Sequence, residues 1–422
     1  MSTEKKNYAL PIAMMFALFF MISFVTGLPS PMGVIVAKQF GASNFESQLG
    51  FLANFIAYAF MGIPAGIMLK KFGYKKTALA AILVGFVGVG VQFFSGVAES
   101  FTVYLTGAFI CGFSMCMLNT VVNPMLNTLG GGGNSGNKLL QFGGSINSIG
   151  ATITPMLVGF LMGAEAGRTI EKANPALILA MGIFALAFVV LFFVQIPEPH
   201  MESTAERKVK HSHSPLSFRH FVFGAIAIFI YVGIEIGIPS TANLFMTASK
   251  TAANAGLGID ATTAGSIVGL YWILMLAGRL IGASVGSKVS SKTMLITVSA
   301  LGLFFILLAI FSPVTATITL PYFLTQVPIS IVFLVLCGLC TSIMWGGIFN
   351  LAVEGLGKYT ASAAGIFMVM VCGGGIVPLI QGFVSDKLGY MNSYWVMFAC
   401  LAYMMWYALI GCKNVNKDIP VE

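Results

Sequence analysis

"GATITPMLVGF" at residues 150–160 and "GGGIVPLIQGF" at residues 373–383 are two apolar stretches that match in their glycines, their proline and their closing Gly-Phe. Three further pairs occur in the same order along the chain: "GLPS" (27–30) with "GIPS" (237–240), "GIPAG" (62–66) with "GRLIG" (278–282), and "NPMLNTLG" (123–130) with "NLAVEGLG" (350–357). One match alone is weak, because glycine and proline are frequent in membrane helices. Four matches in one order indicate an internal duplication.

The composition is that of an integral membrane protein. Of the 422 residues, 57% are hydrophobic and 9% are charged, and the mean hydropathy is +0.91, whereas soluble domains carry about 25% charged residues. A spanning helix needs about 20 apolar residues. We predict an all-α fold of twelve transmembrane helices, at residues 8–28, 47–69, 76–96, 100–127, 139–163, 175–196, 219–246, 264–287, 293–312, 326–353, 361–385 and 392–412.

The longest polar stretch between predicted spans lies near the middle of the chain, at residues 197–218, "IPEPHMESTAERKVKHSHSPLS". We interpret it as a linker. The predicted organisation is an N-terminal six-helix half (1–197), a cytoplasmic linker (198–218) and a C-terminal six-helix half (219–422). Two such halves, related by an axis along the membrane normal, form the architecture of the major facilitator transporters.

The positive charge of the chain indicates its orientation in the membrane. With a cytoplasmic N-terminus and twelve alternating spans, 17 of the 22 lysines and arginines, Arg279 among them, fall on the cytoplasmic side. This bias is the positive-inside rule. It predicts a bacterial-type inner-membrane protein with both termini in the cytoplasm. The net charge of +8 therefore predicts a lipid bilayer as partner and no nucleic acid.

The sequence carries no convincing metal or catalytic motif. All seven cysteines fall in predicted spans. Cys337 and Cys340 have metal-motif spacing, but neither a second pair nor a membrane histidine accompanies them. No nucleophile–base arrangement is recognisable. We therefore expect no metal, no cofactor and no enzymatic activity.

Glu235, in "YVGIEIGIPS" (231–240), is the only acidic residue well inside a predicted span. A carboxylate at the bilayer centre costs roughly 2.5–3.5 kcal/mol on insertion scales, so a functional role is the default expectation. One interpretation is a hydrogen bond to a neighbouring helix that stabilises the bundle. The other is a group that binds substrate or the coupling cation, H⁺ or Na⁺.

The remaining polar residues of the predicted spans are mostly amides. Amides offer paired donors and acceptors without charge, which suits sugar hydroxyls, and aromatic rings offer flat surfaces for a pyranose. For any single amide, hydrogen bonding between helices is an equally good explanation. The predicted substrate-binding residues are Asn119, Asn123, Asn147, Asn350 and Gln381, with Tyr271 and Trp272 as walls.

A basic loop joins the second and third predicted spans. "GIMLKKFGYKK" (66–76) has the Gly-x₆-Gly-x-basic spacing of the corresponding loop in major facilitators, with Lys70 where many members carry aspartate. Gly66 and Gly73 are expected to permit a tight turn. We predict that Gly66, Lys70 and Gly73 form a gating loop, although cytoplasmic positive charge alone explains the lysines equally well.

Several motifs resemble one branch of the major facilitators, the fucose–proton symporters and the glucose/galactose transporters. They are "IPAGIMLKKFGYK" (63–75), "NTVVNP" (119–124), "NSIGATITP" (147–155), "YVGIEIGI" (231–238) and "YWILMLAGRL" (271–280), and the resemblance covers nearly the whole chain. It implies transport of a hexose or deoxyhexose, of the fucose, glucose, galactose or mannose type. A monomer is the default of this class.

The resemblance also locates departures from that branch. The fucose symporters carry an aspartate in span 1 and a glutamate in span 4, which align here with Ser30 and Asn119, and a family glutamine aligns with Gly144. Glu235 is retained, as in the glucose/galactose members. We therefore predict secondary active sugar import by alternating access, with Glu235 as the coupling residue for H⁺ or Na⁺. Uncoupled diffusion, export of a drug or metabolite, and a non-transporting membrane sensor remain alternatives.

Overall fold

The computed structural model of the chain describes residues 8–129, 133–161, 169–196, 213–252, 254–285, 289–320, 325–416 and 418–420. Most of the predicted linker, 198–218, lies outside these ranges. The long and short helices are α1 (Ala9–Gly27), α2 (Pro29–Gln39), α3 (Asn44–Ser47), α4 (Leu49–Val97), α5 (Phe101–Leu129), α6 (Gly133–Leu161), η1 (Ile170–Ala173), α7 (Asn174–Phe193), η3 (Pro215–Ser217), α8 (Arg219–Thr247), α9 (Ala261–Val285), α10 (Ser291–Phe311), α11 (Ile329–Thr341), α12 (Met344–Val353), η4 (Gly357–Tyr359), α13 (Thr360–Met370), α14 (Gly373–Leu388), α15 (Tyr390–Trp406) and η5 (Tyr407–Gly411).

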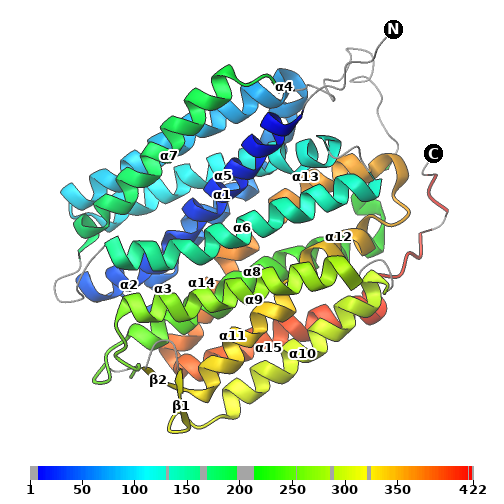
Figure 1. The fold of residues 1–422 in the computed structure, drawn as a ribbon. Coiled ribbons are helices and arrows are strands. Elements are labelled where there is room, and N and C mark those ends of the chain that lie inside the picture. The colour runs from blue at the N-terminus through cyan, green and yellow to red at the C-terminus, as the bar shows by residue number, and fades with distance from the viewer. Residues whose placement is uncertain are drawn as a thin grey trace.

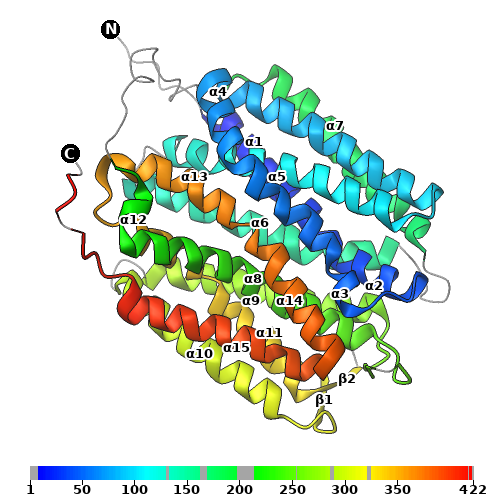
Figure 2. The same cartoon turned by 180° about the vertical axis from the view of Figure 1, so that it is seen from behind.

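The long helices lie side by side in one bundle (Figures 1 and 2). Within the described ranges, eleven helices are long and apolar enough to cross a membrane. One of them, α4, has 49 residues, more than twice the roughly 20 that one crossing needs. Gly73 interrupts α4 with φ 84° and ψ 175°. This helix therefore has the length and the break for two crossings, as predicted for 47–69 and 76–96.

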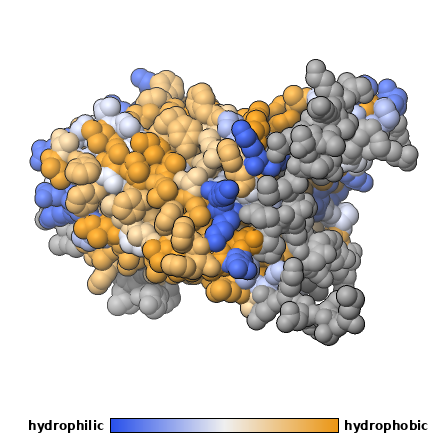
Figure 3. Space-filling model, turned by 90° about the horizontal axis from the view of Figure 1, so that it is seen from above, coloured by the Kyte–Doolittle hydropathy of each residue, from blue (hydrophilic) through white to orange (hydrophobic). Residues whose placement is uncertain are grey.

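The sides of the bundle are covered by large apolar side chains. Phe160, Phe193 and Phe311 are 74%, 76% and 71% exposed. Figure 3 shows a broad hydrophobic surface, with hydrophilic residues at its left edge and again to the right of its centre. A surface of this kind is stable against hydrocarbon and unstable in water. The chain is a multi-pass membrane protein.

The structure contains a short β-hairpin that we did not predict from the sequence. Strands β1 (Thr317–Leu320) and β2 (Thr325–Pro328) form an antiparallel hairpin between α10 and α11, in which Thr317 pairs with Pro328. The span predicted to begin at 326 begins as a helix at Ile329. β-Branched residues in "TITL" favour a strand, so this connection is extended before the helix begins.

Two predicted spans are interrupted within the bundle. Ser342 and Ile343 separate α11 from α12, and Val371 and Cys372 separate α13 from α14. Such breaks free backbone hydrogen-bonding groups, which a bilayer tolerates only where protein or a watery cavity satisfies them. Three residues of these breaks line a cavity at the centre of the bundle: Ser342, Ile343 and Val371.

The start of α1 and the end of η5 lie at one end of the bundle (Figure 1), which we call the terminal face. The opposite end, which we call the far face, contains α3 and the end of α14 (Figure 2). There the Asp386 carboxylate accepts hydrogen bonds from the backbone N–H groups of Asn44 (2.8 Å) and Phe45 (2.9 Å). Asn44 also accepts from the Tyr390 hydroxyl at 2.8 Å and donates to Ser385 at 3.3 Å. We call these residues the far-face latch, because they join the two sequence halves.

Asp386→Asn should weaken the far-face latch, because it removes a charged acceptor, and hydrogen bonds to charged groups contribute about 1.5–3 kcal/mol. We expect the far face to open more often. A cysteine in place of Thr26, which lines the cavity, should then react several-fold faster with a membrane-impermeant thiol reagent applied from that face. Glu99→Gln, which neutralises an exposed carboxylate in the α4–α5 connection, is the matched control. Equal reaction rates in the two variants would contradict the latch.

Candidate functional site

A cavity of about 1220 Å³ lies at the centre of the bundle. Its lining comes from both sequence halves: α1, α2, α4, α5 and α6 in the first, and α8, α9, α10, α12 and α13 in the second. At the terminal face the lining reaches Phe142 of α6, Ser291 at the start of α10 and Asn350 near the end of α12. At the far face the latch holds the halves together. The cavity therefore opens toward the terminal face.

Six of the eight predicted binding and coupling residues line this cavity. They are Asn119, Asn123, Asn147, Glu235, Trp272 and Asn350. Ser30 also lines it and accepts a hydrogen bond from Asn243 at 3.3 Å. The structure thus brings together polar residues as far apart in the chain as Ser30 and Asn350.

The two cavity amides of α5 are also hydrogen-bonded within the protein, and one of these bonds reaches a neighbouring helix. The Asn119 amide donates to the Tyr58 hydroxyl at 3.0 Å and to the Met115 carbonyl at 3.1 Å. Asn123 donates to the Asn119 carbonyl at 2.8 Å. These bonds fix the orientation of the amides on α5, while both side chains remain in the cavity wall. In Asn119, bonding to another helix and exposure to the cavity therefore occur in the same residue.

Tyr271 and Gln381 are not brought to the cavity. The Tyr271 hydroxyl is 3.0 Å from the Thr341 hydroxyl, and Gln381 donates to Ser393 at 3.5 Å. Both side chains are buried between helices of the second half. Consecutive helical residues point in different directions, so Trp272 faces the cavity while Tyr271 faces α11.

The predicted gating loop turns at one of its two glycines. Gly73 has the positive φ of 84° that reverses the chain direction at the terminal face, whereas Gly66 lies within the regular part of α4. The same spacing recurs at the far face, where Gly389 has φ 87° and ψ 164° and Gly382 stands seven residues before it. Asp386 of the latch occupies the position that corresponds to Lys70.

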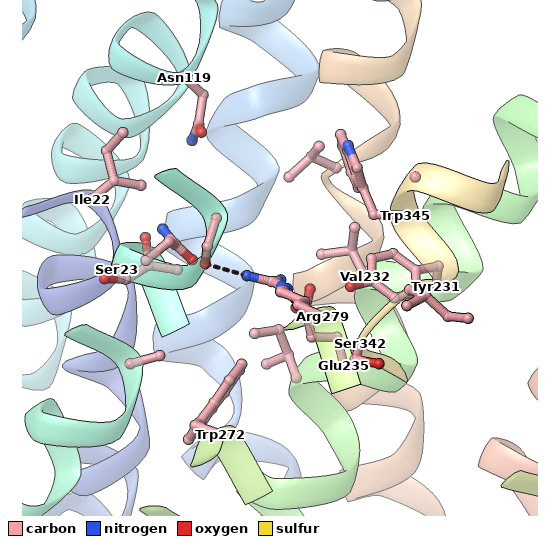
Figure 4. Close-up of a pocket in the computed structure, with 18 of the residues that line it drawn as sticks. Ile22, Ser23, Asn119, Tyr231, Val232, Glu235, Trp272, Arg279, Ser342 and Trp345 are labelled. Carbon is pink, nitrogen blue, oxygen red and sulfur yellow. Dashed lines mark hydrogen bonds and ion pairs between the residues drawn. The ribbon is translucent and has the colours of Figure 1, made fainter. Parts of the chain in front are cut away.

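Arg279 completes the site and corrects the sequence prediction, which assigned it to the cytoplasmic side. It lies in the membrane-spanning part of α9 and lines the cavity. Its Nη2 is 3.6 Å from Oε1 of Glu235, and its Nη1 donates to the Gly144 carbonyl and, at 2.8 Å, to the Ser148 hydroxyl of α6. Figure 4 shows the guanidinium beside Glu235 with its hydrogen bond directed across the cavity. The sequence did contain one indication of this role, because Arg279 falls inside the predicted span 264–287, where a charged residue is expected to be functional.

The ion pair is partly shielded from water. The Arg279 and Glu235 side chains are 15% and 16% exposed. The Tyr231 hydroxyl interacts electrostatically with both, although it forms no hydrogen bond of regular geometry. In a low-dielectric interior each charge needs its partner, because an unpaired buried charge is strongly destabilising. Glu235 therefore joins α8 to α9 and also faces the cavity.

Comparison with known proteins places the chain in a family. Residues 15–378 match the family model of the Major Facilitator Superfamily. A glucose/galactose transporter of Brucella abortus biovar 1 is 28% identical over 417 residues, which cover 98% of this chain and 97% of that protein. An L-fucose-proton symporter of Escherichia coli strain K12 is 24% identical over 410 residues, covering 92% and 89%.

A solved structure has the same fold. The crystal structure of FucP, a major facilitator transporter in the outward conformation, superposes with a TM-score of 0.70 at 21% sequence identity, covering 96% of this chain and 100% of that one. The helical bundle with its central cavity, the match to the family model and this likeness agree with one another. The chain belongs to the Major Facilitator Superfamily.

Proposed function

We propose that this protein imports a hexose or deoxyhexose sugar by alternating access, coupled to H⁺ or Na⁺. The observation that carries the proposal is the cavity between the two sequence halves, which opens toward one face and is closed at the other. Relatives with names of this kind, a glucose/galactose transporter and an L-fucose-proton symporter, match over most of their length. Their names supply the sugar class.

The cavity wall has the chemistry that a neutral sugar needs. Asn119, Asn123 and Asn147 present amides from the first half, and Asn350 presents one from the second. Trp272 of α9 adds a flat ring that suits the apolar face of a pyranose. A sugar held between these groups contacts both halves, so binding can favour a conformation in which they close around it.

We assign the coupling role to Glu235. Ser30 and Asn119 are neutral and both lie in the cavity, so the span 1 and span 4 acids of the fucose symporters have no counterpart at these positions. Of the described residues that line the cavity, Glu235 alone is acidic. Its place in the wall would let it exchange a proton or Na⁺ with water that enters from the open face.

We place the terminal face in the cytoplasm of a bacterial-type inner membrane, with both termini cytoplasmic. The excess of lysine and arginine on that side remains after Arg279 is moved into the cavity. The conformation is then inward-open. The working unit in this proposal is the monomer, because one chain supplies residues around the whole cavity.

Glu235→Gln should abolish concentrative uptake and preserve downhill exchange, because the amide cannot take up a proton or hold Na⁺ as a carboxylate can. Purified protein in liposomes would be tested with labelled fucose, glucose, galactose and mannose under a pH gradient, a Na⁺ gradient or neither. Accumulation that survives the substitution would return Glu235 to a structural role. Absence of uptake for all four sugars would reject the sugar class and favour an exporter or a sensor.

Trp272→Ala should raise the sugar KM up to about tenfold, because an aromatic stacking contact contributes about 0.5–1.5 kcal/mol and about 1.4 kcal/mol corresponds to a factor of ten. Trp395→Ala is the matched control, since Trp395 is 42% exposed on α15 and is absent from the cavity wall. Initial rates of exchange in liposomes give both constants. An unchanged KM in Trp272→Ala would exclude this ring from the sugar site.

A further inference from the structure

Helices α6 and α9 come from different halves, and their contact changes along its length. Near the far face they approach so closely that a Cβ on Gly265 would lie 2.9 Å from the Pro155 carbonyl oxygen, and a Cβ on Gly159 would lie 3.2 Å from the Thr262 Cα. Nearer the terminal face the contact is made by the long Arg279 side chain, which reaches from α9 to α6. The arginine therefore bridges the halves where the helices have separated.

The Arg279 guanidinium is shared between α6, where it bonds Gly144 and Ser148, and the Glu235 carboxylate of α8. Its bond to the Ser148 hydroxyl, 2.8 Å, has the normal length of a hydrogen bond. Its separation from Glu235, 3.6 Å, is longer than the 2.7–2.9 Å that charge-assisted bonds usually show. In this inward-open conformation α6 thus holds the guanidinium at close range, while the carboxylate holds it more loosely.

We propose that Arg279 is a positioning residue for cation coupling. It competes with the coupling cation for Glu235, and whether it pairs with Glu235 changes its hydrogen bonds to α6. The proposal rests on the coupling role of Glu235 in the proposed function. When a proton or Na⁺ neutralises the carboxylate, Arg279 is free to remain on Gly144 and Ser148. When the cation leaves, the carboxylate needs Arg279 again, because an unpaired charge at this depth is costly. The occupancy of Glu235 thereby changes a contact between the halves.

The surroundings of Glu235 limit which groups can respond to the cation. Among the described residues, Arg279 contacts Glu235 from α9, and Tyr231 lies one turn earlier on its own helix. Tyr271, which packs against α11, interacts with Glu235 only electrostatically. Tyrosine is uncharged and arginine is charged throughout the neutral pH range. A pH response of this cluster would therefore report the protonation of Glu235.

Ser148→Ala tests the competition without changing any charge. It removes one of the two bonds from Arg279 to α6, so the guanidinium should remain at Glu235 and the cation should need a higher concentration to displace it. We expect the half-saturating concentration of the coupling cation to rise about tenfold, as for the loss of one hydrogen bond to a charged group. Thr152→Ala is the control: it removes a hydroxyl one turn further along α6 that donates to the Ser148 carbonyl. Its half-saturating concentration should be unchanged.

The readout does not depend on the substrate. Spin labels at Ala42 and Ala252, on far-face connections of the two halves, would report the separation of the halves as H⁺ or Na⁺ is titrated, after the native cysteines have been replaced. A shift in Ser148→Ala but not in Thr152→Ala is the expected result. Equal midpoints in the two variants, or a wild type that does not respond to either cation, would overturn the proposal.

Sugar uptake measured in parallel separates the two proposals. A wild type that takes up none of the sugars, yet shows the expected midpoint shift, would reject the proposed substrate and keep the role of Arg279. Uptake with unshifted midpoints would reject Arg279 alone. Arg279→Gln should lower thermal stability by leaving Glu235 unpaired, and Glu235→Gln in the same chain should restore it. A restored double variant that still responds to the cation would also overturn the proposal.

Discussion

The fold follows from the absence of water in the core of a bilayer, where each backbone N–H and C=O must find a partner within the protein. Long apolar helices meet this condition along most of the chain. Where polar side chains occur in them, many donate back to the preceding turn, as Thr120 does to Cys116 and Thr154 to Gly150. The helix breaks at Ser342–Ile343 and Val371–Cys372 stand at the cavity, where the restriction is relaxed.

Much of this architecture could be predicted, because a segment that crosses the hydrocarbon core has to be a helix of about 20 mostly apolar residues. The predicted span 219–246 agrees closely with α8, Arg219–Thr247, and the paired glycine and proline motifs fall at corresponding places in the chain. Glu235 was recognisable because a carboxylate in an apolar stretch is conspicuous. The hairpin β1–β2 was not recognisable, since it is a short connection whose conformation depends on its neighbours.

The site was harder to predict than the fold. Helices that are apolar on all sides do not indicate by their pattern which side faces a cavity, so Tyr271 and Gln381 could not be separated from Trp272 and Asn350. Arg279 was missed for a related reason. Counting charges on the two sides of the membrane assigns every arginine to a side, and it does not reveal that Arg279 pairs inside the bundle with Glu235, 44 residues earlier on another helix. The conformation itself depends on contacts such as that of Asn44 with Asp386, which join opposite ends of the sequence.

The two glycine turns have a consequence for the timing of transport. Gly73 and Gly389 share nearly the same backbone angles on opposite faces, but the residue three positions before each is Lys70 in one and Asp386 in the other. A carboxylate can accept hydrogen bonds from the start of a helix, whereas an ammonium group cannot. The acceptor that closes the far face therefore has no carboxylate counterpart at Lys70. The far face cannot open while both Asp386 bonds are intact, so their strength contributes to the free-energy barrier of that opening.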